Sequence, residues 1–345
     1  MSLMLKEIAQ QPKMLERTIK AETRKMNAIG KFLHDRDIDL IILAARGSSD
    51  NAAQFGRYLL ETNCGIPVSL AAPSVYTLYR AKLKLDRALV VGVSQSGEGS
   101  DINAVLEDAK KFGAFTLGIT NNGGSAITRV ADETLLIHAG PEKSVAATKT
   151  YTGQMLQFYL LANALLDDGR KRIELEKIPQ FSAAALELRE TVKEIAQRYS
   201  FMENCVVVGR GLNYGNSFEL ALKLMETCYV VAERFSSADF FHGPLAMVER
   251  RFPILMFAPG GVTRRSNLDL LERLRGLNAD SFSITNDRQV ARLSSRNLWM
   301  DPGIEEVLSP IPFIIPAQLF AAYLSEAKGL DPDKPRSLSK VTKTV

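Results

Sequence analysis

The chain has 345 residues, of which 46% are hydrophobic and 24% charged, and its 43 Lys and Arg stand against 39 Asp and Glu. This composition is typical of a globular protein long enough to form two domains. The small positive charge is spread along the chain, and charged residues interrupt every long apolar run. We therefore expect neither a nucleic-acid-binding protein nor a membrane protein.

The cysteines Cys64, Cys205 and Cys228 are odd in number and show no metal-ligand spacing. They predict buried thiols in a reducing compartment and no metal site. The first residues contain no apolar segment of the signal-peptide kind, so we expect a cytoplasmic protein.

Two strand-like runs in the first half of the chain each end in a polar loop. Behind a leading helical segment, Leu40–Ala44 leads into Arg46-Gly47-Ser48-Ser49, and Leu89–Val93 leads into Ser94-Gln95-Ser96-Gly97. A helix-like stretch follows each loop, the second one over Asp101–Phe112. This alternation predicts a parallel sheet covered on both faces. Both loops would lie beyond the carboxyl ends of the strands, where ligands bind in such sheets.

The second half of the chain repeats the first. The run Cys205–Val208 leads into Gly209-Arg210-Gly211 and a helix, and Gly211 lies 164 positions after Gly47. The stretch Ala258-Pro259-Gly260-Gly261 lies 164 positions after Ser94-Gln95-Ser96-Gly97. The segments "LGITNN" and "FSITND" also align, at an offset of 165. Three landmarks at nearly one offset indicate two copies of one α/β unit.

We predict an α/β fold with two tandem, doubly wound parallel-sheet domains of the flavodoxin-like type. A helix over Leu268–Leu277 belongs to the second copy. The predicted segments are a leading helical segment (1–30), a first domain (31–170), a helical linker (171–200), a second domain (201–328) and a tail (329–345).

The loops of the first copy carry groups that suit an anion. A loop between a parallel strand and a helix presents backbone N–H groups at the helix N-terminus, where negative charge is favoured. Ser48, Ser49, Ser94 and Ser96 add hydroxyl donors, and Gly97 allows close approach of the backbone. These loops predict a phosphate monoester site, with plain turns as the alternative. The chain contains no GxxxxGK[ST] nucleotide loop.

The stretch Gly209–Gly215 approaches the dinucleotide-binding fingerprint, and Glu233 follows about twenty residues on. Its spacing is GxGxxxG rather than GxGxxG, and the first copy lacks the second glycine. A nicotinamide site is therefore the weaker hypothesis, and we expect no cofactor.

Three charged residues form a stripe on an otherwise apolar helix. Glu219, Lys223 and Glu226 fall at i, i+4 and i+7 of "FELALKLMET", so they share one face. Such spacing is also typical of a solvent-facing ion pair. A helix that is apolar on its other sides should be wrapped by protein, which favours a stripe that lines a cavity. His242, in "FFHGP", follows in a loop from which it can face a site.

Four motifs, "SQSGE", "SVAATKTYT", "ELALKLMET" and "HGP", resemble the sugar isomerase (SIS) family of phosphosugar-binding proteins. The chain is similar in particular to the isomerase half of glutamine:fructose-6-phosphate amidotransferases and to single-chain amino-sugar-phosphate deaminases. The resemblance extends over essentially the whole chain.

The resemblance implies a phosphate site and a set of catalytic residues. It implies that Glu226 moves a proton between sugar C1 and C2, and that Lys223 stabilises the enediol oxygen. His242 would open the sugar ring from the neighbouring subunit of a homodimer. Lys340 would form an imine with the open-chain ketose, although a lysine in such a tail is ordinarily exposed. Glu219 and Glu142 would position these groups, and Gly47 would help to position the substrate. The phosphate pocket would comprise Ser48, Ser49, Ser94, Gln95, Ser96 and the backbone near Val145 and Ala147.

Two positions depart from the family pattern. Gly99 stands where relatives often have Thr, and Ala147 stands where they have Ser. We expect either weaker phosphate binding or a hydroxyl contact from Ser100 in place of the missing one.

We expect a metal-free, cofactor-free enzyme that converts glucosamine 6-phosphate to fructose 6-phosphate and ammonia. Glutamine-driven synthesis needs an ammonia-releasing domain with an amino-terminal cysteine nucleophile, and no cysteine precedes Cys64. We therefore do not expect glutamine-driven synthesis by this chain alone. The alternatives are a deglycase for fructosamine-type 6-phosphates, an isomerase module of the glutamine–fructose-6-phosphate transaminase type, and a sugar-phosphate sensor without turnover. A sensor would not need Glu226, His242 and Lys340 together, and the sequence shows no DNA-binding segment before the repeat.

Overall fold

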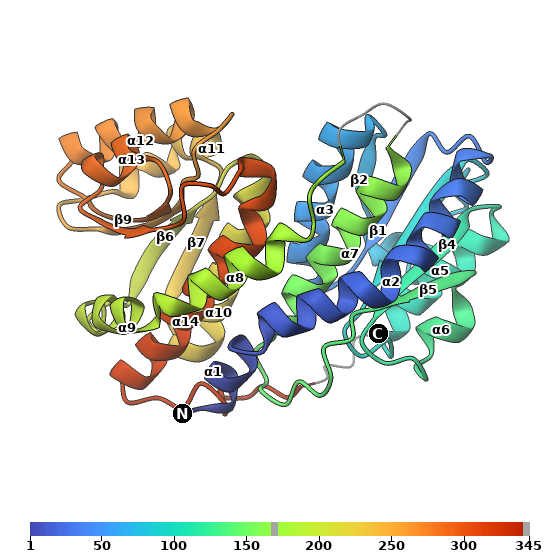
Figure 1. Ribbon diagram of the computed structural model, residues 1–345, viewed down its shortest axis with the longest axis horizontal. Helices are drawn as coiled ribbons and strands as arrows, with labels where there is room; N and C mark the ends of the chain where they lie inside the picture. The colour runs from blue at the N-terminus through green and yellow to red at the C-terminus, as the bar shows by residue number, and fades with distance from the viewer. Residues whose placement is uncertain (167–171, 341–345) are drawn as a thin grey trace. The chain divides into compact units, whose positions relative to one another are not determined.

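The computed structural model describes residues 1–166 and 172–340 and divides the chain into two compact units (Figure 1). The amino-terminal unit comprises the described residues of Lys13–Glu142, Lys149–Glu176 and Ser339–Val345. The carboxy-terminal unit comprises Met1–Pro12, Lys143–Thr148 and Lys177–Leu338. The predicted boundary between positions 170 and 171 and the last five residues of the predicted tail lie outside the described residues.

The amino-terminal unit is built on a five-stranded parallel sheet with the strand order β2-β1-β3-β4-β5. Two of its three interior strands, β3 and β4, are buried at every position, because each is a continuous run of apolar and small residues covered on both faces. The strands are β1 (Leu40–Ala44), β2 (Val68–Leu70), β3 (Ala88–Val93), β4 (Phe115–Thr120) and β5 (Glu133–Leu136).

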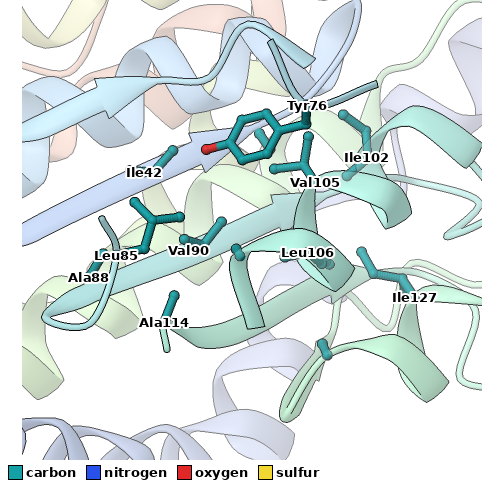
Figure 2. Packing of buried hydrophobic residues seen from close by; sticks show 13 residues of the cluster. Ile42, Tyr76, Leu85, Ala88, Val90, Ile102, Val105, Leu106, Ala114 and Ile127 are labelled. Carbon is teal, nitrogen blue, oxygen red and sulfur yellow. The ribbon is translucent and has the colours of Figure 1, made fainter. Parts of the chain in front are cut away.

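Helices cover both faces of this sheet. The long helices α3 and α7 pack against each other, and α4 and α6 pack against α5. Figure 2 shows the core beneath α5, where Val105 and Leu106 face Ile42 of β1 and Val90 of β3. The helices are α2 (Gln11–His34), α3 (Ser48–Cys64), α4 (Pro73–Thr77), α5 (Ser100–Lys111), α6 (Ile127–Val130) and α7 (Lys149–Leu165).

The carboxy-terminal unit has the same architecture. Its parallel sheet has the order β10-β9-β8-β6-β7, which is the order of the first sheet read in the opposite direction. Its strands are β6 (Asn204–Val208), β7 (Val231–Phe235), β8 (Pro253–Phe257), β9 (Asp280–Thr285) and β10 (Arg296–Trp299).

The helix α14 of this unit is apolar around its whole circumference and is almost entirely buried. It packs against α8, α9 and α10. The helical elements of the unit are α1 (Leu3–Ile8), α8 (Lys177–Glu187), α9 (Arg189–Arg198), α10 (Tyr214–Cys228), α11 (Ser237–Phe241), α12 (Arg264–Gly276), α13 (Arg288–Leu293), α14 (Pro310–Ala327) and the short η1 (Gly211–Asn213), η2 (Pro244–Met247) and η3 (Glu306–Leu308).

Two flavodoxin-like sheets confirm the fold that the internal repeat predicts. The helix expected at Leu268–Leu277 begins earlier, at Arg264. The sequence pattern did not predict this first turn because the turn is polar and carries no apolar periodicity. The leading helical segment is a pair of helices, α1 and α2, and α2 continues to His34. Within the described part of the chain, no helix combines the length and apolar character needed to cross a bilayer.

Candidate functional site

Two polar loops lie side by side at one edge of the amino-terminal sheet. The strands β1 and β3 pair in parallel, with Leu43 opposite Val91 and Ala44 opposite Gly92, so they end at the same edge. The chain then enters α3 at Ser48 and α5 beyond the loop that follows β3. Because β2 lies on one side of β1 and β4 lies beyond β3, this is the switch point of the sheet, where ligands bind in doubly wound folds.

Two glycines shape these loops. Gly47, just before α3, has φ of 56°, and Gly97 has φ of 70°, in the left-handed region that favours glycine. A Cβ at Gly97 would also lie 2.0 Å from the Ser125 hydroxyl oxygen. A side chain at Gly97 is therefore excluded both by its backbone conformation and by its neighbour.

The serine hydroxyls of the loops already accept hydrogen bonds from the protein. Ser94 Oγ accepts from the Gly97 N–H (3.0 Å), and Ser96 Oγ accepts from the Glu98 N–H (3.3 Å). The buried Ser49 Oγ accepts from the Gln154 side chain (2.8 Å). A hydroxyl that accepts such a bond keeps its own proton as a donor. The hydroxyls of Ser49, Ser94 and Ser96 are thus held in place, each with a proton that an anionic oxygen can accept.

Other contacts fix the course of the second loop. The Gln95 carbonyl accepts from the Asn121 N–H and from the Thr120 hydroxyl, both at the end of β4. These bonds hold the backbone of the loop against the neighbouring strand. The positioning of the loop therefore comes from β4, which no motif in the loop itself reveals.

A charged pair connects the two helix N-termini. Arg46 Nε lies 2.8 Å from Oδ2 of Asp101, which is buried in the first turn of α5. In the first turn of α3, burial raises the pKa of Asp50, and the charge of Arg46 opposes this shift. Arg46 therefore balances carboxylates that would otherwise repel an anion at this edge.

Glu142 and Lys340 are brought together in the same unit. Lys340 Nζ lies 2.8 Å from Glu142 Oε2, and the Glu142 side chain is fully buried. The same carboxylate accepts from the Thr150 N–H and hydroxyl at the start of α7. Lys340 is thus ion-paired and only partly exposed, unlike a lysine in a solvated tail.

The loop with Val145 and Ala147 belongs to the carboxy-terminal unit. Glu7 of α1 accepts hydrogen bonds from the backbone N–H groups of Lys143 and Ser144, and Gln318 of α14 donates to the Thr148 carbonyl. The part that Val145 and Ala147 take in phosphate binding stays a prediction.

The charged stripe of α10 is buried. Lys223 Nζ lies 2.6 Å from Glu226 Oε2 and 3.4 Å from Glu219 Oε1. Glu219 and Lys223 have almost no exposed side-chain surface, whereas the Glu226 side chain is 21% exposed. A solvated surface pair is therefore the wrong interpretation of this spacing. The lysine offsets the repulsion between two carboxylates, and only Glu226 has surface within reach of another molecule.

A face of α10 next to the charged stripe is apolar and partly exposed. Phe218 and Leu222 are half-buried, and Met225 is exposed. Exposed apolar side chains also occur at Val231 on the edge strand β7 and at Phe241. The polarity of this helix is thus inverted relative to an ordinary surface helix.

His242 is exposed at the end of α11, next to Phe241. Its N–H donates to the Asp239 carbonyl, and Gly243 follows with φ of 129°. The chain turns sharply here and leaves the imidazole at the surface of the carboxy-terminal unit.

The switch point of the carboxy-terminal sheet contains a carboxylate of the protein itself. Thr263, at the start of α12, donates its hydroxyl to Glu306 Oε1 (2.6 Å) and its N–H to Oε2 (3.3 Å). A Cβ at Gly261, the counterpart of Gly97, would lie 2.2 Å from Glu306 Oε2. Glu306 therefore occupies the position at this helix N-terminus that the first copy leaves to its hydroxyl loop.

The roles of four residues of these sites could not be predicted from sequence motifs. Arg46, Asp101, Gln154 and Glu306 act through contacts with segments distant in sequence. Gln154 alone leaves a signal, as an amide in the apolar run of α7. The other three occur in polar segments where charged residues are ordinary.

The fold and the paired switch points define a tandem doubly wound α/β protein. The family model of the SIS domain matches residues 36–164 and 199–325, one match in each copy. The chain belongs to the SIS domain family.

Relatives of known name share this architecture. The chain is 35% identical over 342 residues to a glutamine–fructose-6-phosphate aminotransferase [isomerizing] from Pyrococcus horikoshii, covering 98% of this chain and 57% of the relative. It thus spans little more than half of that protein. The C-terminal domain of glucosamine-fructose-6-phosphate aminotransferase from Francisella tularensis superposes with a TM-score of 0.87 at 29% identity, covering 96% of this chain and 98% of that one. A glucosamine-6-phosphate deaminase from Thermotoga maritima shares the fold, with a TM-score of 0.80 at 22% identity over 99% of this chain and all of its own.

Proposed function

We propose that this protein is a phosphosugar aldose–ketose isomerase that deaminates an amino-sugar 6-phosphate, most simply glucosamine 6-phosphate to fructose 6-phosphate and ammonia. The buried triad Glu219–Lys223–Glu226 is the observation that carries the proposal. Burial of three charges is costly and adds little to stability, so a functional reason for keeping them is the simpler account. The names of the relatives support a sugar-phosphate substrate.

The substrate phosphate would bind at the switch point of the amino-terminal sheet. The hydroxyls of Ser49, Ser94 and Ser96 each retain a proton to donate, and the N-termini of α3 and α5 favour negative charge. Gln95 and Ser48 complete the proposed phosphate pocket, and Gly47 would help to position the substrate.

The proposed reaction moves two protons within the substrate. In the open-chain substrate, Glu226 removes the proton from C2 and returns it to C1, while the C2 amine loses a proton and the C1 oxygen gains one, which converts the C1 aldehyde and C2 amine into a C1 alcohol and a C2 imine. Water then hydrolyses this imine to the ketone and ammonia. Lys223, whose ammonium already contacts Glu226, stabilises the negative charge that develops on the C1 oxygen.

Lys340 would form an imine with the open-chain ketose: its amine nitrogen bonds to C2, and the C2 ketone oxygen leaves as water. Its amine can attack C2 only after losing a proton, and Glu142 Oε2, 2.8 Å away, is a carboxylate placed to accept it. Glu142 would thus position Lys340 and hold it as an ammonium between turnovers. The ion pair supports this role for a lysine whose position in the chain suggests none.

A homodimer completes the proposal, with His242 entering the neighbouring subunit's site. His242 lies among exposed apolar side chains, including Phe241 and Met247, and this surface suits a second copy of the chain. Mixing inactive Glu226→Gln and His242→Ala chains should restore part of the activity, because some mixed dimers then hold one intact site. Chains that exchange subunits and stay inactive would contradict a shared site.

A second candidate is the isomerase module of a glutamine-dependent aminotransferase. It is favoured by the curated relatives, which carry that name and of which the chain spans little more than half. The experiment that separates the candidates measures ammonia released from glucosamine 6-phosphate alongside fructose 6-phosphate formed. Equimolar, catalytic release supports the deaminase. Isomerisation of hexose 6-phosphates without ammonia release favours the module, and binding without turnover leaves a sensor.

A further inference from the structure

A cleft lies in the carboxy-terminal unit, away from the switch point of its sheet. Its volume is about 850 Å³, and its walls come from the segments where β8, β9 and β10 begin. The strands of a parallel sheet begin and end at opposite edges, so this cleft is at the far edge from Glu306 and the loop before α12. Its size is in the range of small-molecule sites.

Four arginines from four segments line this cleft. Arg198 ends α9, Arg251 precedes β8, Arg275 lies in the last turn of α12, and Arg292 lies in the last turn of α13. The lining includes one carboxylate, Asp280. Four positive charges in one cleft repel one another, and a bound anion would relieve that repulsion.

Among the residues that the structure describes, these guanidinium groups have no ion-pair or hydrogen-bond partner. In residues 1–166 and 172–340, none of the four forms an ion pair or donates a side-chain hydrogen bond, whereas Arg264 and Arg265 of the same unit pair with Asp287 and Asp269. A planar guanidinium presents a fork of donors that matches two phosphate oxygens. The cleft therefore offers several unused phosphate-binding groups.

The backbone at the cleft is held in an unusual conformation. Arg251 has φ of 67° and Asn278 has φ of 56°, and the Arg251 N–H donates to the Asn278 carbonyl (2.8 Å). A bulky residue in the left-handed region is rare, and such residues concentrate at functional sites.

The aromatic ring of Phe201 also lines the cleft and is 59% exposed. An exposed aromatic face stacks well on a nucleobase. We propose that the arginine cleft binds a nucleoside di- or triphosphate, with the phosphates on the guanidinium groups and the base on Phe201. The proposal concerns a different edge and unit from the sugar-phosphate site and does not depend on that site's function.

Calorimetric titration of the full chain with ADP tests the proposal. Fructose 6-phosphate is present in excess, so that ADP does not occupy the loops after β1 and β3. The Arg251→Gln/Arg292→Gln double variant should bind ADP at least about 10-fold more weakly, because each lost charge-assisted contact costs roughly that factor. Arg273→Gln, also exposed on α12 but outside the cleft, is the matched control and should bind like wild type. Arg292→Gln alone serves if the double variant does not fold.

Further ligands identify the groups recognised. AMP should bind more weakly than ADP, and Phe201→Ala should weaken ADP while leaving inorganic diphosphate unchanged. No ADP binding at millimolar concentration, or equal binding by the cleft and control variants, would overturn the proposal. Duplex DNA that binds more tightly than ADP, and is lost in the same double variant, would also overturn it and assign the cleft to nucleic acid.

Discussion

The switch points of the two sheets are built alike and filled differently. Gly47 and Gly211, 164 positions apart, have φ of 56° and 59°, and Asn103 and Asn267 share the same offset in α5 and α12. Yet the first switch point keeps a loop of serine hydroxyls, and the second holds the carboxylate of Glu306. The first switch point thus has room for the anion of a ligand, whereas the second is occupied by a carboxylate of the protein itself.

The helices that follow the first strand of each copy also differ, and here the second copy is the one that carries charges. On α10 the stripe is Glu219, Lys223 and Glu226, while the positions 164 residues earlier on α3 are Phe55, Leu59 and Thr62. The copy that lacks an open anion edge is therefore the one whose helix after the first strand carries a buried charged stripe. We therefore propose that the first copy binds the substrate phosphate and the second copy carries the catalytic residues.

The largest expected effect on stability comes from the charged helix. Lys223→Met leaves two carboxylates close together without their cation, so we expect unfolding to become easier by about 3–5 kcal/mol. The triple change to Phe, Leu and Thr, as on α3, should recover much of that loss because no charge stays buried. Urea unfolding of both variants measures the difference. A loss under about 1 kcal/mol in Lys223→Met would mean that water reaches the stripe.

The two loop glycines of the amino-terminal copy form the next test. Gly47→Ala places a Cβ in open space, so only its backbone conformation, with φ of 56° and ψ of −133°, should matter, at about 1–2 kcal/mol. Gly97→Ala has a positive φ and also collides with Ser125, so we expect it to cost about 2–4 kcal/mol and to weaken phosphate binding. Denaturant midpoints compare them directly. Equal costs would show that the loop relaxes around the added methyl group.

Glu306→Ala should make the second switch point resemble the first. The loss of its bonds to Thr263 should cost about 1–2 kcal/mol, as for a helix cap. Sulfate should then stabilise the variant more than wild type, because an anion can enter the vacated helix N-terminus. Melting temperatures at several sulfate concentrations provide the measurement. Identical sulfate responses would limit Glu306 to a structural role.

The smallest effect concerns pH. Although burial acts in the opposite direction, hydrogen bonds from the Val290 N–H, the Arg264 guanidinium and the Gln289 N–H hold the pKa of Asp287 below its ordinary value. Its contribution to stability is therefore present above its unfolded pKa, near 4, and is lost as pH falls through the folded pKa. Asp287→Asn should flatten this acid loss. The amino-terminal copy has Asn122 at the matching position, and Asn122→Ala should leave the acid profile unchanged.

The sequence predicts the parts of this arrangement that repeat. Continuous apolar runs that end in Gly and Ser mark the strands and their loops, and the common offset reveals two copies before any contact is known. The i, i+4, i+7 spacing places Glu219, Lys223 and Glu226 on one face of a helix.

Burial of that face could not be decided from spacing alone. Asn216 and Cys228 of α10 hydrogen-bond to carbonyls of α14, and packing against α14 helps to enclose the helix. The role of Glu306 could not be predicted either. Glu306 begins the short helix η3, and its contact with Thr263 depends on loop conformation and not on periodicity. Contacts between distant segments decide both features.

The division between binding and catalysis is tested most directly by comparing Glu226→Gln with Ser96→Ala, using turnover of glucosamine 6-phosphate and the dissociation constant of the sugar phosphate for each. Glu226→Gln keeps the shape of the side chain but removes the base, so turnover should fall by about 10²–10⁴ with nearly unchanged affinity. Ser96→Ala removes one donor and should weaken affinity by about 10-fold, with a smaller effect on turnover at saturation. Exposed Glu272→Gln is the control for charge and should change neither quantity. Unchanged turnover in Glu226→Gln, or loss of affinity equal to that in Ser96→Ala, would contradict the account.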